Sequence, residues 1–173
     1  EFYQKAEYRV CDSRILLAGS QWLGTPIIEQ IAGSDFFPAF CAKRGNSHKI
    51  FLLGGSTPET ASKAQAAFPD SIVATYSPPM VFETNPQEHQ KILTLIRESG
   101  ADTLAVGVGS PKQENWIVSN RANLPQIRLF FAVGKTIDFM GGASSRAPKW
   151  MQRAGLEWAY RLLQEPQRLA KRY

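Results

Sequence analysis

The chain has 173 residues, of which 43% are hydrophobic and 20% charged, and this length and balance fit one globular domain with a sizeable core. No apolar run reaches the roughly 18 to 20 residues of a membrane-spanning helix, and no signal peptide opens the chain, so we expect neither a spanning nor a secreted protein. Cys11 and Cys41 fit neither a metal spacing nor a disulfide framework, and His48 and His89 lie beside no cysteine cluster. We therefore expect reduced thiols in the cytoplasm and no metal site.

The net charge of +5 is confined to the C-terminal tail. Residues 1–143 carry equal numbers of acidic and basic side chains, whereas residues 144–173 carry seven Lys/Arg and two Asp/Glu. This asymmetry predicts an anionic partner for the tail, such as phosphate groups, acidic lipid or nucleic acid, although a solvated helix has the same composition.

Hydrophobic patterning alternates between strands and helices along the chain. Residues 1–8 fit the end of a helix, residues 9–17 mix strand and turn character, and residues 19–32 and 34–44 have helical patterns separated by Gly33. Buried strands are expected near residues 50–53, 71–75, 103–108 and 128–133, with an amphipathic helix over residues 86–99. This alternation predicts an α/β fold, with a parallel sheet covered by helices on both faces.

Residues 104–114 read as a buried strand, a turn containing Gly107 and Gly109, and the first turn of a helix. Ser110 suits an N-cap and Pro111 the first helical position, so free N–H groups are expected beyond the end of the strand, where α/β sheets bind ligands. Gln113 has two interpretations: it closes its own helix as a capping box with Ser110, or it binds an anion.

Four further positions follow predicted strands and are candidates for a nucleotide site. Gly54 lies in a strand-to-helix turn in which Thr57 caps the next helix, although structural glycines explain that turn equally well. Tyr76 suits either stacking on a base or packing in the core. Asp138 suits hydrogen bonds to ribose hydroxyls, and Asp12 is expected at or near a strand end, pointing into a cleft, or else in an ordinary Asx-turn.

The tail is predicted to be a helix over residues 149–164 that breaks or restarts at Pro166. If it restarts, Arg168, Lys171 and Arg172 share one face. Their combination with Trp150, Trp158 and other apolar residues of the tail is typical of a helix lying on an acidic membrane, although the aromatic residues also suit packing on the sheet domain.

Several segments together resemble the WecG/TagA/CpsF glycosyltransferases (glycosyltransferase family 26). The matching segments are GVGSPKQENWI, AVGKTIDFMGG, SSRAP and GLEWAYRLLQEPQRLAKRY, with weaker GSDFF and IFLLGG segments in the same order. The resemblance covers nearly the whole chain. It implies a Rossmann-like three-layer α/β/α sandwich over residues 1–143, without the family's N-terminal segment, and a basic helical appendage over residues 144–173.

The resemblance also implies an activity. Such enzymes move an N-acetylmannosamine-type sugar or another hexose from a UDP donor to a polyprenyl-diphosphate-linked sugar, with inversion, without a metal or another cofactor, in cell-envelope polysaccharide synthesis. They act at the inner face of the cell membrane, bound peripherally to its anionic surface. The absence of a D-x-D motif agrees with metal independence, no nucleic-acid partner is expected, and a homo-oligomer is compatible with the sequence.

Site residues follow from the same resemblance. Asp12 matches the general base, Gln113 a residue beside the leaving diphosphate, and Asp138 a uridine contact. Arg161, Arg168 and Lys171 match basic positions of the appendage that would hold the acceptor's diphosphate. Arg146 and Arg172 are further basic residues of the tail that we expect to contact this diphosphate or the membrane.

Three positions depart from the family's pattern. Ser13 replaces the glycine that usually follows the aspartate, Gln30 a phosphate-binding arginine, and Lys135 a common glycine. The departures leave a non-catalytic UDP-sugar-binding paralogue as an alternative. A dinucleotide-dependent oxidoreductase lacks its glycine fingerprint here, and the tail lacks a nucleic-acid readout motif.

Overall fold

The computed structural model describes residues 2–44 and 47–164, which fall into two compact units by their contacts. The sheet unit consists of residues 1–9 and 33–144. The second, which we call the appendage unit, combines residues 10–32 with the described part of residues 145–173. Residues 10–32 were expected in the first domain, whereas their contacts group them with the tail. The division at residue 143 as a functional boundary stays a prediction.

The sheet unit contains four parallel strands in the order β2-β1-β3-β4. The strands are β1 (Ile50–Gly54), β2 (Ile72–Tyr76), β3 (Thr103–Gly107) and β4 (Leu129–Ala132). Each strand lies within one residue of its predicted bounds, and the α/β parallel fold is confirmed.

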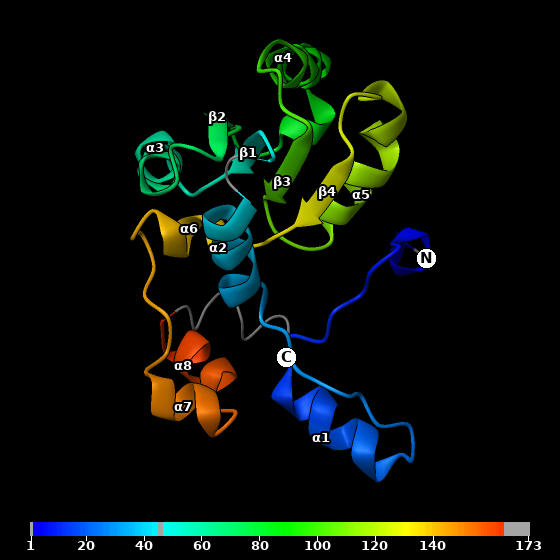
Figure 1. The fold of residues 1–173 in the computed structure, drawn as a ribbon, viewed down its shortest axis with the longest axis vertical. Helices are drawn as coiled ribbons and strands as arrows, with labels where there is room; N and C mark the ends of the chain where they lie inside the picture. The colour runs from blue at the N-terminus through cyan, green and yellow to red at the C-terminus, as the bar shows by residue number, and fades with distance from the viewer. Residues whose placement is uncertain (1, 45–46, 165–173) are drawn as a thin grey trace. The chain divides into compact units, whose positions relative to one another are not determined.

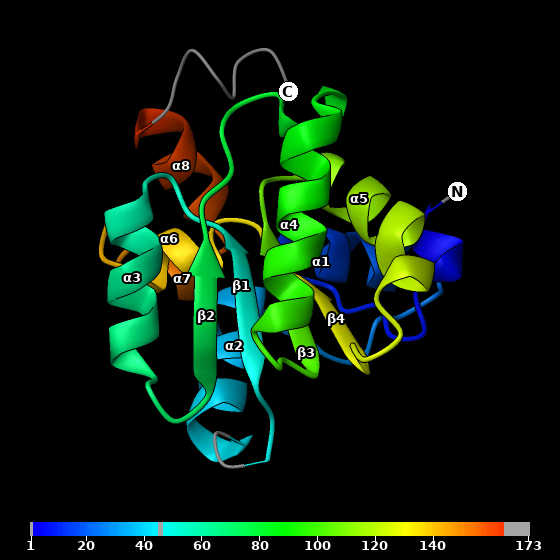
Figure 2. The ribbon, with the colours of Figure 1, turned by 90° about the horizontal axis from the view of Figure 1, so that it is seen from above.

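Helices cover both faces of this sheet (Figures 1 and 2). Successive side chains of β1 point to opposite faces and are apolar on both, so each face needs a layer of helices to bury it. Phe51 and Leu53 pack into a core with α4 (Pro86–Glu98) and α5 (Lys112–Asn120). Ile50 and Leu52 pack into a second core, on the face of α2 (Gly33–Arg44), α3 (Pro58–Ala67) and α6 (Thr136–Met140). Three short 3-10 turns complete the unit: η1 (Phe2–Lys5), η2 (Phe82–Thr84) and η3 (Arg121–Asn123).

Strands β1 and β3 are neighbours, but the chain leaves β1 for β2 on one side and β3 for β4 on the other. Such a reversal of strand order is where open α/β sheets bind ligands, just beyond the carboxyl ends of the strands. Gly54 and Gly107 end these strands and face each other in register. A Cβ on Gly54 would lie 2.6 Å from the Gly107 carbonyl oxygen, so the two strand ends approach more closely than any side chain allows.

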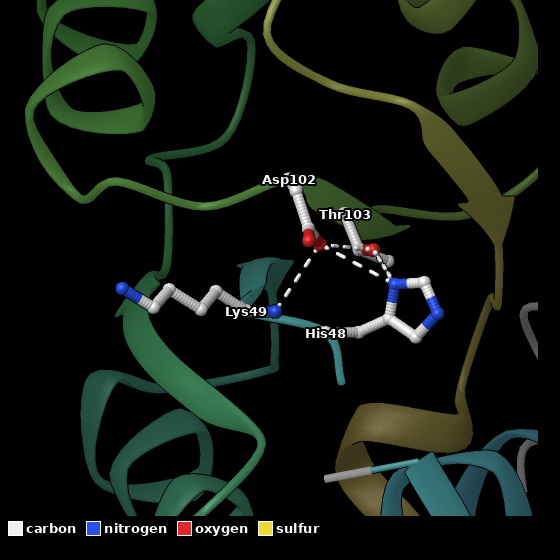
Figure 3. A network of polar contacts seen from close by, with 4 residues as sticks. All are labelled: His48, Lys49, Asp102 and Thr103. Carbon is white, nitrogen blue, oxygen red and sulfur yellow. Dashed lines mark hydrogen bonds and ion pairs between the residues drawn. The ribbon is translucent and has the colours of Figure 1, made fainter. Parts of the chain in front are cut away.

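The opposite, amino edge of the sheet is held by a polar cluster (Figure 3). One carboxylate oxygen of Asp102 accepts hydrogen bonds from the Lys49 backbone N–H at 3.1 Å and from the Thr103 hydroxyl at 2.8 Å. The same oxygen lies 3.5 Å from His48 Nδ1, and the Asp102 carbonyl accepts the Arg128 N–H at 2.7 Å. Asp102 therefore connects the beginnings of β1, β3 and β4.

The appendage unit contains three helices: α1 (Arg14–Trp22), α7 (Lys149–Arg153) and α8 (Glu157–Gln164). The single helix predicted over residues 149–164 is wrong, because Gly155 has a left-handed backbone (φ +74°) that ends α7 before α8 begins. Among the described residues, no helix combines the length and hydropathy needed to cross a bilayer.

Candidate functional site

The candidate site in the sheet unit lies just beyond the carboxyl ends of the strands, which we call the carboxyl edge of the sheet. Side-chain hydrogen bonds there join the loops that follow the four strands. Asp138 Oδ1, in the first turn of α6, accepts the Ser56 N–H at 2.7 Å. The Ser77 hydroxyl donates to the Gly55 carbonyl at 2.8 Å, and Gln113 Oε1 accepts the Gly134 N–H at 3.1 Å. These three bonds connect segments from 21 to 82 residues apart in sequence.

Gln113 is buried, and it does not form the capping box that was one of its two interpretations. That motif requires an N–H at the N-cap, but the N-cap of α5 is Pro111, which has none, and the predicted cap at Ser110 is therefore also wrong. Gln113 instead receives the Gly134 N–H and donates through Nε2 to Glu114 Oε1 at 3.0 Å. The side chain thus fixes the start of α5 against the loop after β4.

The loop between β3 and α5 remains accessible at Gly109. Its backbone is left-handed (φ +91°), and an added Cβ would have no neighbour within 4 Å. The Ser110–Pro111 peptide bond that follows is cis. By contrast, Gly54 has its Cβ space filled by the neighbouring strand, which gives it a structural role whatever else it does.

Thr57 caps α3 as predicted, its hydroxyl accepting the Thr60 N–H at 3.2 Å, and Pro58 begins the helix. The N-terminus of α3 therefore follows β1 at the same edge as that of α5.

Tyr76 ends β2 and packs against the α4 core while its hydroxyl meets two charged side chains. The hydroxyl donates to Glu88 and accepts a hydrogen bond from Lys91 Nζ at 2.7 Å, and Nζ lies 4.7 Å from the ring centroid. The hydrogen bond to Tyr76 raises the pKa of the Lys91 ammonium. Packing in the core, one of the two interpretations of Tyr76, is confirmed in part.

An ion pair joins the start of α5 to η2. Lys112 Nζ lies 2.9 Å from Glu83 Oε1. Partial burial by itself raises the pKa of Glu83, but hydrogen bonds from its backbone amide and from Lys112 outweigh burial, so the net shift is downward. Lys112 therefore contributes positive charge at the beginning of α5.

Asp12 belongs to the appendage unit and does not follow a strand, contrary to the sequence expectation. Residues 10–13 have no regular structure and lead into α1, whose N-cap is Ser13, with its hydroxyl accepting the Leu16 N–H at 3.3 Å. This local cap explains why the apolar residues after Asp12 become a helix. Two hydrogen bonds join residues 11–12 to residues 30–31. Gln30 Nε2 donates to the Asp12 carbonyl at 2.8 Å, and the Ile31 N–H donates to the Cys11 carbonyl at 2.9 Å. Sequence reasoning missed this pairing of Gln30 with Asp12.

The predicted acceptor residues are described only in part. Arg146 lies 3.8 Å from Glu157, with both side chains largely buried. The side chain of Arg161 and residues 168, 171 and 172 lie outside the described part of the chain. Among the described residues, no three His, Cys, Asp or Glu side chains are grouped so as to hold a metal ion.

The fold and the site together define a class of protein, and comparison with known families agrees with it. A parallel α/β unit with its loops gathered at the topological switch point is the architecture of nucleotide-binding transferases, among others. The chain matches the model of the glycosyl transferase WecG/TagA/CpsF family over residues 1–173 and belongs to that family. The expected resemblance is thereby confirmed, and membership supports a role as a glycosyltransferase in cell-envelope polysaccharide synthesis.

Proposed function

We propose that the protein transfers a hexose, of N-acetylmannosamine type or related, from a UDP-sugar to a polyprenyl-diphosphate-linked sugar. The reaction is metal-independent and inverts the anomeric centre, and it takes place at the inner face of the cell membrane. One observation supports the UDP-sugar part of this proposal. At the carboxyl edge of the sheet, hydrogen bonds of Asp138 and Gln113 join the loops after β1, β3 and β4.

The uridine diphosphate is proposed to bind at this edge. Asp138 uses one oxygen for the Ser56 N–H, and a carboxylate has further acceptor capacity for ribose hydroxyls. The Gly109 turn, open on its Cβ side, lets a phosphate approach the N–H groups at the start of α5. Gln113 uses one of its two amide N–H groups for Glu114, and Lys112 adds positive charge nearby. Tyr76 and the Gly54 turn are proposed to border the base and the diphosphate.

The transfer step is a single displacement. The Asp12 carboxylate takes the proton of the acceptor hydroxyl while that oxygen attacks the anomeric carbon, and the bond from this carbon to the β-phosphate oxygen breaks. UDP leaves with the electron pair, and N–H groups and cationic side chains stabilise the developing charge. Arg146, Arg161, Arg168, Lys171 and Arg172 are proposed to bind the acceptor's diphosphate or the membrane, since arginine makes bidentate contacts with phosphate.

Donor binding is tested by titrating UDP into wild type and Asp138→Asn in a calorimeter. Asparagine still accepts the Ser56 N–H, so the fold is retained, but the lost charge is expected to weaken UDP binding about tenfold. Asp70→Asn, an exposed aspartate in the turn between α3 and β2, is the matched control and should bind UDP normally. Unchanged binding by Asp138→Asn contradicts the assigned donor site.

Catalysis is tested with Asp12→Asn, using radiolabelled UDP-N-acetylmannosamine and a polyprenyl-diphosphate-linked sugar. Transfer should fall by at least about a hundredfold while UDP affinity stays unchanged. Glu29→Gln, an exposed carboxylate on the same segment, should keep full activity. A parallel loss of transfer and UDP affinity in Asp12→Asn indicates a structural role for Asp12 instead.

A non-catalytic UDP-sugar-binding protein is the second candidate, favoured by Gln30 in place of the family's usual arginine. Wild-type protein that binds UDP but transfers no sugar from any member of a UDP-sugar panel supports this alternative.

A further inference from the structure

Helix α1 has three of its large apolar side chains outside, whereas Leu17 is half-buried and the one buried residue is polar. Its buried residue is Ser20, whose hydroxyl donates to the Leu17 carbonyl at 2.7 Å and accepts the Ile27 N–H at 2.9 Å. Ile15 and Leu16 are 60% and 63% exposed, and Trp22 is 95% exposed. A helix whose only partner is its own protein shows the reverse pattern.

The exposed apolar residues lie on one side of α1. Residues 15, 16, 22 and 23 fall on a single side of a helix with 3.6 residues per turn, with Gly19 between the two pairs. Leu23 directly follows α1, and Ile28 lies in the loop beyond it and is fully exposed. We call the four side chains of Ile15, Leu16, Trp22 and Leu23 the α1 apolar face.

The α1 apolar face belongs to the same unit as the basic tail. A Cβ on Gly155 would lie 3.5 Å from the Arg14 Cβ, so the beginning of α1 packs against the turn between α7 and α8. A hollow of about 680 Å³ lies between α1 and this turn, lined by Ile15, Leu17 and Trp22 on one side and Ala154 on the other. Trp150, in α7, is also well exposed.

Charge identifies the surface that would cover this face. Residues 10–32 carry one basic and two acidic side chains, and residues 145–173 carry seven basic and two acidic ones, so the two segments together have a net charge of +4. An apolar helix face with tryptophan at its end, in a unit whose sequence is strongly basic, matches an anionic bilayer surface. A second copy of this chain is a poorer match, because two units that each carry a net charge of +4 repel each other.

We propose that the α1 apolar face inserts into the headgroup region of an anionic membrane, as a contact additional to the basic tail. This inference rests on the proposed function in one respect, the purpose of the contact. That purpose is to hold the enzyme at the surface where a lipid-linked acceptor is presented. The insertion itself requires neither donor nor acceptor.

The test is sedimentation of full-length protein with vesicles of phosphatidylcholine, with or without an equimolar amount of phosphatidylglycerol. Leu16→Gln/Leu23→Gln should bind the anionic vesicles at least about tenfold more weakly than wild type, because two exposed side chains lose their burial in lipid. Met80→Gln, which alters a still more exposed apolar residue of the sheet unit, should bind like wild type. Equal binding by the double variant overturns the inference.

A second measurement follows Trp22 directly, in a Trp150→Phe/Trp158→Phe background that leaves Trp22 and the buried Trp116. Lipids brominated on their acyl chains should quench Trp22 fluorescence, and Trp22→Phe in this background should lose the quenching. Absence of quenching overturns the inference. So does protection of Trp22 from acrylamide without vesicles, or self-association that Leu16→Gln/Leu23→Gln abolishes, since protein then covers the face.

UDP titration of the same variants separates this inference from the proposed function. Loss of vesicle binding with UDP affinity intact supports the membrane contact. Intact vesicle binding in a protein that does not bind UDP supports the contact while contradicting the proposed donor site.

Discussion

At the scale of single residues, the carboxyl edge of the sheet depends on glycines whose Cβ space is already occupied. Gly107 is the clearest case, because an added Cβ would lie 2.6 Å from the Gly134 carbonyl oxygen and 2.7 Å from Ile137 Cδ1. Ile137 is fully buried and the Gly134 N–H donates to Gln113 Oε1, so neither can move without disturbing the loop after β4.

We predict that Gly107→Ala lowers the free energy of unfolding by about 1–3 kcal/mol, the usual cost of overpacking, and also weakens UDP binding. Urea unfolding and UDP titration measure the two effects. Gly33→Ala is the matched control, because the nearest atom to its Cβ is Thr136 Oγ1 at 4.0 Å and its backbone is helical. If Gly107→Ala is as stable as wild type, the strand ends have more room than the structure shows.

Local patterns predicted most of the sheet unit and failed where the contacts are long-range. The apolar runs around Leu52 and Ala105 are bounded by turn residues, and this was enough to place four strands. The destination of the Gln113 side chain was not predictable, because Gly134 lies 21 residues away and the local Ser-x-x-Gln pattern pointed to a cap. The Asp138 side chain was assigned to a ligand, but its bond to Ser56, 82 residues away, has no local signal.

At the scale of elements, the position of the α5 N-terminus depends on an ion pair that changes with pH. The Glu83 carboxylate has a lowered pKa in the folded protein. Its ion pair with Lys112 therefore contributes stability at pH values above the pKa that Glu83 has in the unfolded chain. That contribution disappears as the pH falls through the folded pKa, when Glu83 takes up a proton.

We predict that Lys112→Gln lowers the free energy of unfolding at pH 7 by less than about 1 kcal/mol, since the lysine is half exposed. The difference from wild type should shrink below about pH 4, where the unfolded carboxyl group is protonated. Denaturant unfolding at several pH values measures this. Lys63→Gln, an exposed lysine of α3, should show no such pH dependence; a constant difference for Lys112→Gln contradicts an ionic role.

Helix α1 shows why the appendage unit was harder to predict than the sheet unit. Ile15, Leu16 and Leu17 were assigned to strand and turn because a buried strand and an outward-facing apolar helix both appear as a short hydrophobic run. The helix predicted over residues 19–32 is wrong in its bounds, because α1 begins at Arg14 and ends at Trp22. The Ser13 cap settles the local structure, but the Ser20–Ile27 bond that turns the polar side inward is visible only in three dimensions. The break at Gly155 has a local signal, because a glycine within a helical pattern can mark the end of a helix.

At the scale of the whole molecule, the two units differ in charge, core and proposed ligand. The sheet unit has two apolar cores and a candidate nucleotide edge. The appendage unit has the excess positive charge and the exposed α1 apolar face. A division of labour follows, in which a soluble nucleotide and a membrane surface each order a different part of the chain.

We predict that amide hydrogen exchange separates these two responses. UDP alone should slow exchange in residues 54–57, 107–113 and 134–138, because ligand binding stabilises the segments that it contacts. Anionic vesicles alone should slow exchange in residues 14–28 and 149–163 and leave the sheet edge unchanged. The core strand amides at Leu52 and Ala105, already protected by ladder hydrogen bonds on both sides of their strands, serve as the internal reference in both experiments. If UDP protects residues 14–28 as strongly as the sheet edge, the division between a donor unit and a membrane unit is wrong, because the nucleotide then orders the α1 segment directly.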